Sequence, residues 1–394
     1  MIVLYHMIKR DYWLEIIENA WKHRSLIWLS GVRRAGKTVL AQSLSNVEYF
    51  DCELPSVRQQ LEDPESFLSG LNKKRIVLDE IHRLRNPSEI LKIAADHFSD
   101  TKVLATGSST LQASSKFKDT LTGRKTEIWL TPMINADMVA FNNVDIRHRL
   151  LRGGLPSFFL SSAIPERDFQ EWLDSFWSKD IQELFRLEKQ YSFKKFVELI
   201  FTNSGSIFEA TKYATPAEAS RVTITNYLSV LEQTYIAYII RPFSSRKATE
   251  IISAPKVYAF DTGFVCYYKG WFQLRNDDLG FLWEHFVLNE IQAKTQKRDI
   301  YYWRDKRGHE LDFILIGKNK EPIVAECKWS VANFNPKNLK IFRKNYKKGQ
   351  NFVIAQDVNR AFSRNYEGIK VSFVSLADFV KNLDSSSTLL AVGK

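Results

Sequence analysis

The sequence predicts an α/β protein in three parts: a P-loop core on a parallel sheet, a helical winged-helix middle region and a C-terminal α/β domain. In the first third, short apolar segments alternate with helix-like segments, as in strand–helix repeats that form a parallel sheet. In the middle, apolar residues recur at helical spacing. The last third returns to apolar, strand-like segments separated by turn residues.

The first strand is predicted at Leu26–Leu29 and a helix at Val39–Leu44. The segment between them fits the phosphate-binding pattern G-x-x-x-x-G-K-[ST], with Gly31, Val32, Arg33, Arg34, Ala35, Gly36, Lys37 and Thr38 in order. Glycines in such a turn let backbone N–H groups face a phosphate at a helix N-terminus. We expect residues 31–39, Val39 included, to bind ATP, with Lys37 on the β/γ-phosphates and Thr38 on Mg²⁺.

A second strand, Arg75–Leu78, ends in Asp79 and Glu80. Two acids at a strand end suit the Mg²⁺ and water chemistry of phosphoryl transfer, which depends on positioning and electrostatics. We expect Asp79 to hold the Mg²⁺ shell through water and Glu80 to polarise the attacking water. The pattern is common in isolation, and the pairing with Lys37 and Thr38 makes it specific.

A third strand, Lys102–Thr106, runs into Gly107 and Ser108. Thr106 or Ser108 is a candidate sensor of the γ-phosphate, and a strand-end hydroxyl that only satisfies a turn is the equal alternative. Between the first two motifs we expect a strand at Val47–Phe50 and a helix at Val57–Leu68. The extra strand and the Glu beside the Asp suit ATP hydrolases better than GTP switches.

These segments resemble the AAA+-type ATPase core of a widespread group of predicted bacterial and archaeal ATPases. The matching stretches are residues 31–38, Val77–Glu80, Ala105–Ser109 and Leu121–Arg124. In that group a winged-helix region and a C-terminal domain of the PD-(D/E)xK nuclease superfamily, a restriction-endonuclease-like α/β fold, follow the core. The resemblance implies ATPase activity and domains at 1–140, 141–268 and 269–394; the group's biological role does not follow from the fold.

Arg124 lies after the sensor-like strand, where an arginine of one subunit could reach a neighbour's γ-phosphate. Such a finger raises hydrolysis by orders of magnitude and would require a homo-oligomer. An arginine that pairs with a nearby acid is at least as good an interpretation.

Composition indicates a cytoplasmic protein that does not enter a membrane. Hydrophobic residues make up 44% of the 394 residues, and the three cysteines have neither disulfide nor metal spacing. No apolar run approaches the roughly 18 residues that span a bilayer.

The net charge of +11 points to an acidic partner, and DNA is the candidate. Residues 337–348 carry at least six cations on an expected amphipathic helix, with Leu339, Phe342 and Tyr346 toward a core. Such a stripe would neutralise phosphates, and a merely solvated face is the equal alternative.

The middle region predicts a helix at Asp168–Leu187 and then a winged-helix unit. Its expected helices and strands are Phe193–Thr202, Ile207–Tyr213, Arg221–Gln233, Tyr235–Ile240 and Lys256–Phe260. The third of these helices would occupy the groove-reading position. Arg221 is its only cation, which favours a structural role over DNA readout.

The C-terminal third predicts a hairpin of Leu311–Leu315 and Ile323–Lys328. This length puts Asp312 beside Glu326, with Lys328 on the same strand face as Glu326.

A helix before the hairpin, at 281–287, adds Glu284, which completes the parts of a PD-(D/E)xK site. We expect Asp312 and Glu326 to bind Mg²⁺ or Mn²⁺, Glu284 to support the metal or its water, and Lys328 to orient the attacking water. Leu311 stands where the pattern has proline. Glu310 is left aside as lying on an alternating face, and a hairpin with a surface salt bridge is the alternative.

Together these observations predict a Mg²⁺-dependent ATPase that couples ATP hydrolysis to a DNA-interacting, nuclease-like domain. One alternative is an ATP-governed signalling or assembly switch whose nuclease-like domain only binds a partner. A ring-forming DNA-remodelling motor is another. Stimulation of hydrolysis by DNA separates the switch from the others.

Overall fold

The computed structural model describes residues 8–72, 74–107, 120–163, 166–182, 189–244, 254–317 and 320–385. The chain divides into two compact units, each assembled from separate stretches. The first unit consists of residues 1–145, 154–194 and 229–236, and the second of residues 146–153, 195–228 and 237–394.

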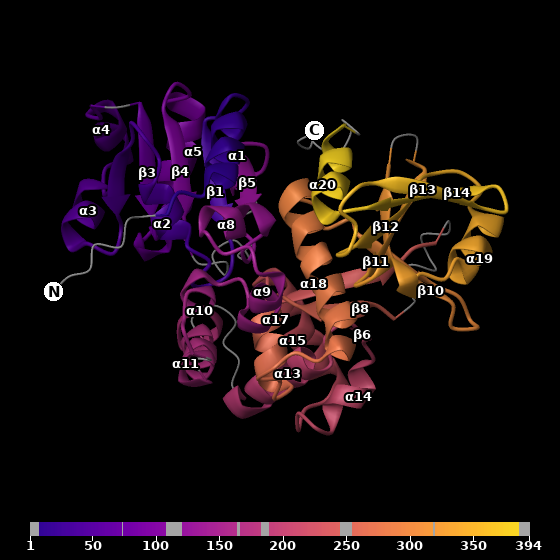
Figure 1. Cartoon of the computed structure of the whole chain (residues 1–394). Coiled ribbons are helices and arrows are strands. Elements are labelled where there is room, and N and C mark those ends of the chain that lie inside the picture. Colours follow the sequence, from indigo (N-terminus) through magenta and orange to yellow (C-terminus); the bar gives the residue numbers. More distant parts are fainter. Residues whose placement is uncertain are drawn as a thin grey trace. The chain divides into compact units, whose positions relative to one another are not determined.

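The first unit is built on a five-stranded sheet in the order β2-β3-β4-β1-β5, in which every neighbouring pair is parallel (Figure 1). Its strands are β1 (Leu26–Ser30), β2 (Glu48–Asp51), β3 (Arg75–Asp79), β4 (Lys102–Thr106) and β5 (Lys125–Trp129). The parallel α/β core expected from the sequence is thus confirmed, and four of its strands fall where they were predicted. The apolar pattern missed β5.

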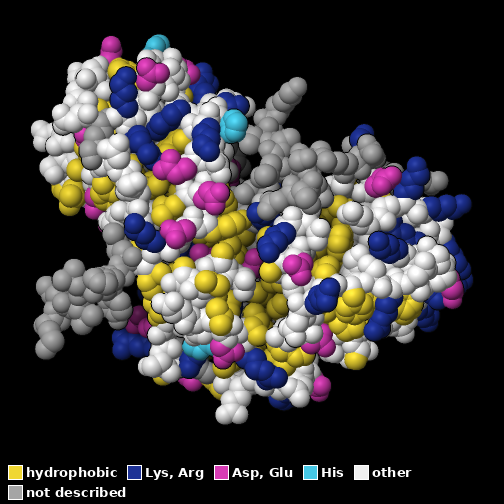
Figure 2. Space-filling model, turned by 45° about the horizontal axis from the view of Figure 1, so that its top comes forward, with side chains coloured by type: hydrophobic (Ala, Val, Ile, Leu, Met, Phe, Trp, Pro, Cys, Tyr) yellow, Lys and Arg dark blue, Asp and Glu magenta, His cyan; other side chains and the backbone are white. Residues whose placement is uncertain are grey.

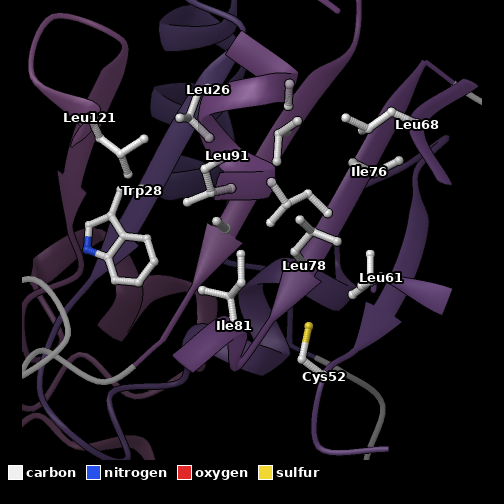
Figure 3. Packing of buried hydrophobic residues seen from close by; sticks show 14 residues of the cluster. Leu26, Trp28, Cys52, Leu61, Leu68, Ile76, Leu78, Ile81, Leu91 and Leu121 are labelled. Atoms are coloured by element: carbon white, nitrogen blue, oxygen red, sulfur yellow. The ribbon is translucent and has the colours of Figure 1, made fainter. Parts of the chain in front are cut away.

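Helices cover this sheet on the side shown in Figure 3, where Trp28 and Leu78 of the strands pack with Leu91 of α5. The helices that lie in this unit are α1 (Asp11–Trp21), α2 (Lys37–Gln42), α3 (Pro55–Gln60), α4 (Pro64–Ser69), α5 (Pro87–His97), α8 (Asn135–Ala140), α10 (Pro156–Phe159) and α11 (Glu166–Phe176). A short 3₁₀ turn, η1 (Ile81–Arg83), follows β3.

In this unit, the helices expected at 57–68 and 168–187 differ from the observed ones. The single helix expected at 57–68 is the pair α3 and α4, because Pro64 cannot continue a helix but suits a first turn, and Asp63 caps α4 by accepting from the Ser66 N–H at 3.1 Å. The helix expected from Asp168 begins at Glu166 and changes at Trp177 into a π-helical turn, η2 (Trp177–Ile181).

The second unit is built on a nine-stranded mixed sheet in the order β13-β14-β12-β11-β10-β9-β7-β8-β6. Its strands are β6 (Ser206–Ile207), β7 (Ala237–Pro242), β8 (Lys256–Ala259), β9 (Tyr301–Arg304), β10 (Glu310–Ile316), β11 (Pro322–Lys328), β12 (Asn351–Ala355), β13 (Phe362–Tyr366) and β14 (Ile369–Val374). Strands β11, β12 and β14 run parallel, and β10 forms the expected antiparallel hairpin with β11.

Helices cover both faces of this sheet. Its helices are α9 (Ile146–Arg152), α14 (Ala210–Ala214), α17 (Thr262–Tyr268), α18 (Asn276–Thr295), α19 (Lys337–Asn345) and α20 (Leu376–Ser385), with a 3₁₀ turn, η4, at Val331–Asn333. Phe352 of β12 packs on α20, and the next residue, Val353, packs in a cluster with α19. Because successive strand residues face opposite sides, α20 and α19 lie on opposite faces of the sheet, as Figure 1 also shows.

In the middle of the chain the order is α13 (Gln190–Thr202), β6, α14, α15 (Arg221–Gln233), β7 and β8. Strand β8 pairs antiparallel with both β6 and β7. Strand β7 also pairs with β9, so these strands continue into the C-terminal sheet. Among the helices of the described residues, none combines the length and apolarity needed to span a bilayer.

Candidate functional site

The phosphate-binding pattern lies in the loop between β1 and α2. Gly31 and Gly36 have φ values of 143° and 94°, which favour glycine. At Gly31 a side chain is also excluded by space, since a Cβ atom would lie 2.5 Å from the Leu130 carbonyl oxygen. Helix α2 begins at Lys37, so the loop ends at a helix N-terminus, where backbone N–H groups and the helix dipole favour an anion.

A pocket of about 450 Å³ opens at this loop. Its lining residues all belong to the first unit and are Gly31, Arg33, Arg34, Gly36, Lys37, Thr38, Val39, Glu80, His82, Gly107, Pro156, Ser157 and Asp180. The pocket therefore gathers the carboxyl ends of β1, β3 and β4, the edge of a parallel sheet where ligands bind.

The Lys37 ammonium points back onto its own loop. It donates hydrogen bonds to the Gly31 and Val32 carbonyl oxygens at 2.9 and 3.1 Å. Burial lowers the pKa of Lys37, and the nearby Glu80 and Asp180 carboxylates offset part of that shift. The Lys37 ammonium is thus held at the loop by two hydrogen bonds, which phosphate oxygens could replace.

Asp79 is 2% exposed at the end of β3 and is held by two hydroxyl groups. Tyr49 donates to its Oδ2 at 2.5 Å, and Thr106 donates to its Oδ1. The Thr106 hydroxyl also accepts from the Glu80 N–H at 3.1 Å. Thr106, expected as a γ-phosphate sensor, therefore hydrogen-bonds to the Asp79 carboxylate and to the Glu80 backbone N–H. It is not among the residues that line the pocket. Ser108, the other sensor candidate, lies outside the described residues.

Glu80 lines the pocket from a left-handed backbone conformation with φ of 53°. Its Oε2 lies 3.0 Å from Nδ1 of His82, two residues on. Burial opposes ionisation of Glu80, but the His82 hydrogen bond and the Lys37 charge outweigh it, so the pKa of Glu80 is lowered. The carboxylate is therefore ionised, as an acceptor of a water proton must be. Sequence analysis missed His82, although its position directly after the acidic pair was a usable signal.

A buried ion pair between Arg10 and Asp137 holds the phosphate loop through the Ala35 backbone. Arg10 binds Asp137 through Nε at 2.8 Å and through a terminal nitrogen at 2.7 Å. Its other terminal nitrogen donates to the Ala35 carbonyl oxygen at 2.9 Å. Trp13 adds a hydrogen bond to Asp137 at 3.2 Å. The two residues lie 127 positions apart in the sequence, so no local sequence pattern predicted this ion pair.

Arg124 forms a two-point ion pair with Asp96, at 2.7 and 3.0 Å. This is the acid pairing that was the alternative to an arginine finger. Arg124 is not among the residues that line the pocket of its own chain. A role in a neighbouring subunit would require this pair to open.

The second unit contains a separate charged cluster on β10 and β11. The Lys328 ammonium lies 3.1 Å from Asp312 and 2.7 Å from Glu326, so the hairpin brings these three predicted residues together. The Cys327 N–H donates to Asp312 at 2.8 Å, which orients that carboxylate.

The fourth predicted residue, Glu284 of α18, joins the cluster through two residues of β8. Tyr258 donates to Glu284, and the Lys256 ammonium lies 3.6 Å from it. Lys256 also pairs with Glu310. Setting Glu310 aside was wrong, because residues two apart on a strand share a face and Glu310 therefore lies on the Asp312 side. Sequence analysis missed Lys256 and Tyr258, which precede the hairpin by about 50 residues.

The pKa values of Glu326 and Asp312 are shifted in opposite directions by their surroundings. Burial and then the Asp312 charge raise the pKa of Glu326 to about 8, against Lys328. Burial also acts to raise the pKa of Asp312, but Lys328, Lys256 and the Cys327 N–H outweigh it and the pKa is lowered. Two carboxyl groups with separated pKa values are the arrangement that acid–base chemistry uses.

The cluster fits a divalent metal poorly as it stands. Among the described residues there is no group of three or more histidine, cysteine, aspartate or glutamate side chains placed to hold a metal ion. The Lys328 ammonium lies between the two carboxylates, so a metal would have to share them with it.

The basic segment at 337–348 is less exposed than expected. Helix α19 ends at Asn345, and the solvent-facing lysines are Lys337, Lys344, Lys347 and Lys348. Figure 2 shows Lys and Arg side chains gathered at the right-hand edge of the view, where α19 and the β13–β14 hairpin lie.

Arg343, which was counted as a solvent-facing cation of this segment, is buried. Its guanidinium donates to backbone carbonyl oxygens, including those of Tyr346 at 3.1 Å, Gln350 at 2.8 Å and Pro322 at 3.1 Å. These hydrogen bonds to carbonyl oxygens near the turn from α19 to β12 give the buried guanidinium polar partners, which explains why a charge can be buried here.

Three stretches of the chain match known families. Residues 23–139 match an AAA domain, residues 143–275 a domain of unknown function (DUF8612) and residues 279–376 another domain of unknown function (DUF4143). The first match identifies an AAA-type ATPase domain around the pocket, which supports nucleotide use, usually with Mg²⁺.

The related proteins add no function. An uncharacterized protein of Mycobacterium tuberculosis is 28% identical over 307 residues, which cover 74% of this chain and 68% of that protein. An uncharacterized protein of Methanocaldococcus jannaschii is 24% identical over 357 residues, 80% of this chain and 77% of that protein. The solved Bacillus subtilis DNA clamp loader delta protein is 12% identical, with 70% of this chain and 98% of that one covered, but a TM-score of 0.26 supports no conclusion.

Proposed function

We propose that this chain is an ATPase that binds Mg²⁺–ATP in the pocket at residues 31–39 and hydrolyses it. The observation that carries the proposal is the convergence of Lys37, Thr38 and Glu80 on one pocket of about 450 Å³ in an AAA-type domain. The size lies within the range of small-molecule sites, which is roughly 300–1,000 Å³.

Each residue has a role that its surroundings support. Lys37 would exchange the two loop carbonyl oxygens for β/γ-phosphate oxygens. Thr38 would ligate Mg²⁺, and Asp79, which is aligned by two hydroxyl donors and directly precedes Glu80 but does not itself line the pocket, would hold a water of the metal. Mg²⁺ supplies charge neutralisation on the phosphates. Glu80 would accept the proton of the attacking water, with His82 holding one of its oxygens.

Hydrolysis is tested with two variants of the full chain. Lys37→Ala removes the loop cation and should abolish ATP binding in calorimetry. Glu80→Gln keeps the shape of the side chain but cannot accept a proton, so ATP should bind while phosphate release stops. Hydrolysis by Glu80→Gln at the wild-type rate would remove Glu80 from this role, and absence of ATP binding by the wild type would end the proposal.

A second candidate is phosphodiester chemistry in a nuclease-like C-terminal domain (269–394), linked to the core (1–140) through a winged-helix region (141–268). The observation that favours it is the contact of Lys328 with both Asp312 and Glu326 beside Glu284. Such a lysine stabilises negative charge on a phosphate, and exposed lysines such as Lys344 would hold a DNA backbone. A Mg²⁺ or Mn²⁺ ion would have to share Asp312 and Glu326 with the Lys328 ammonium, so the dependence of cleavage on metal is part of the test.

Cleavage is tested by incubating single-stranded, duplex and branched DNA with Mg²⁺ or Mn²⁺. Asp312→Asn and Lys328→Met should stop cleavage and leave ATP hydrolysis intact, because the two sites share no residues. Without cleavage but with salt-sensitive DNA binding, the domain is a binding module. Without either, and with DNA-independent ATPase activity, the ATP-governed switch is the better account.

A further inference from the structure

The nucleotide pocket includes an acid that lies outside the AAA-type match at 23–139. Asp180 lines the pocket and belongs to the same compact unit as the phosphate loop. Its side chain is 7% exposed. A carboxylate oxygen accepts hydrogen bonds, as phosphate oxygens do, so Asp180 is not itself a ligand for the phosphates that the pocket is proposed to bind and its presence requires an explanation.

Arg33 of the phosphate loop holds Asp180 in the pocket. Nε of Arg33 lies 2.9 Å from the Asp180 Oδ2 atom, although the residues are 147 positions apart. The backbone of the same arginine is held as well, because Trp172 donates from its indole to the Arg33 carbonyl oxygen at 3.1 Å. Both contacts come from the segment 166–182, which fixes one loop residue at its side chain and at its main chain.

The conformation of that segment is unusual at the point of contact. Asp180 lies in the π-helical turn η2, which directly follows α11. Such turns are rare and recur at functional sites. The turn lets Asp180 and Ile181 be buried together with Trp177.

Arg33 is a natural ligand for phosphate as well as for carboxylate. A guanidinium forms charged hydrogen bonds with either anion, and phosphate offers more acceptor oxygens. Arg33 is 30% exposed and lines the same pocket as Lys37 and Thr38.

We infer that Asp180 is a positioning residue that occupies Arg33 in the empty pocket, and that nucleotide phosphates compete with it for this guanidinium. The inference rests on the proposed nucleotide site. Asp180 lowers the affinity for ATP, because the pair must open before Arg33 reaches a phosphate. By reciprocity, bound nucleotide weakens the hold of η2 on the loop.

The test compares two aspartates of the same segment. Asp180→Asn keeps the shape and removes the charge, so ATP and inorganic tripolyphosphate should bind about tenfold more tightly in calorimetry at fixed ionic strength. The matched control is Asp174→Asn, since Asp174 pairs with Lys194 and is not among the pocket residues. It should change affinity by less than about twofold. Should Asp180→Asn not fold, Asp180→Ala carries the same expectation.

A double-mutant cycle identifies the mechanism. Arg33→Ala should weaken ATP binding, and adding Asp180→Asn in that background should then change affinity by less than about twofold, because no guanidinium is left to compete for. Equal tightening in both backgrounds would mean direct repulsion of phosphate and would overturn the inference. Unchanged or weaker binding by Asp180→Asn would overturn it too, as expected of a purely structural residue. Absence of ATP binding by the wild type is a different result, which ends the proposed function itself.

Discussion

The hydroxyl of Ser30 donates to the hydroxyl of Tyr235, at 3.2 Å and across 205 residues. Ser30 is the last residue of β1 and directly precedes the phosphate loop, while Tyr235 follows the end of α15. Tyr235 also donates to Glu127 of β5 and stacks on Trp129, with ring centroids 4.9 Å apart. These contacts connect the segment after α15 to β1 and β5, and all of the residues belong to one compact unit.

Tyr235→Phe should lower the free energy of unfolding by about 1–3 kcal/mol, because the buried Ser30 hydroxyl and the Glu127 carboxylate lose a hydrogen-bond partner. Urea denaturation measures the change. Tyr191→Phe is the control, since Tyr191 is 64% exposed and should change stability by less than about 0.5 kcal/mol. Equal effects of the two changes would show that the Tyr235 hydroxyl does not fasten this segment.

Asp137→Asn should lower the free energy of unfolding by about 3–5 kcal/mol, since the Arg10 cation is 4% exposed and would remain buried without a counter-charge. Because Arg10 also holds the Ala35 carbonyl group, ATP affinity should fall together with stability. Denaturant titration and calorimetry measure the two quantities. The matched control is Glu18→Gln, whose partner Arg75 lies nearer the surface, with an expected change below about 1 kcal/mol. If Asp137→Asn lowered the free energy of unfolding no more than Glu18→Gln does, the stabilising role of the Arg10–Asp137 pair would be contradicted.

Gly263→Ala should destabilise the second unit, because its Cβ would lie 2.5 Å from the Arg152 carbonyl oxygen. Helices α9 and α17 approach closely here, and Asp261 caps α17 by accepting from the Gly263 N–H at 2.9 Å. This packing accounts for the Asp-Thr-Gly stretch at 261–263. We expect a loss of about 1–3 kcal/mol in denaturant titration.

The matched control for that change is Gly280→Ala. Gly280 lies in α18 with open space at its Cβ position, so alanine should stabilise the protein by about 0.5–1 kcal/mol. Opposite signs at the two glycines are the expected result. Stabilisation by Gly263→Ala would show that the contact between the helices relaxes freely.

His285 should make stability depend on pH. It is buried in α18, with its Nε2 atom 2.6 Å from the Ser204 hydroxyl, and burial lowers its pKa to about 4 from the ordinary value of 6.5. Between these values the unfolded chain binds the proton and the folded protein does not, so stability is complete above pH 6.5 and declines as the pH falls toward 4. Relative to His285→Gln, the wild type should lose about 2–3 kcal/mol between pH 7 and pH 4.5 in denaturant titrations. Parallel curves for the two proteins would refute the assignment.

Local pattern was sufficient for the features that depend on neighbouring residues. The apolar runs at β1, β3 and β4 predicted buried parallel strands, because a strand covered on both faces has no polar alternation. The glycine and lysine spacing at 31–38 predicted the loop for the same local reason. The hairpin length likewise predicted that Asp312 and Glu326 lie close together. The strand face of Glu310 was predicted wrongly, since it is the face of Asp312.

Only the tertiary structure decided which distant residues complete each site. Arg10 with Asp137, Arg33 with Asp180 and Lys256 with Glu284 are separated by loops and whole helices, and charged residues have many possible partners along the chain. Arg343 shows the same limit, since its position on an amphipathic helix predicted exposure, whereas hydrogen bonds to backbone carbonyl oxygens hold it inside. Periodicity reports which face of an element is apolar, whereas the pairing of buried charges follows from how the elements pack, because desolvation makes each buried charge require a partner.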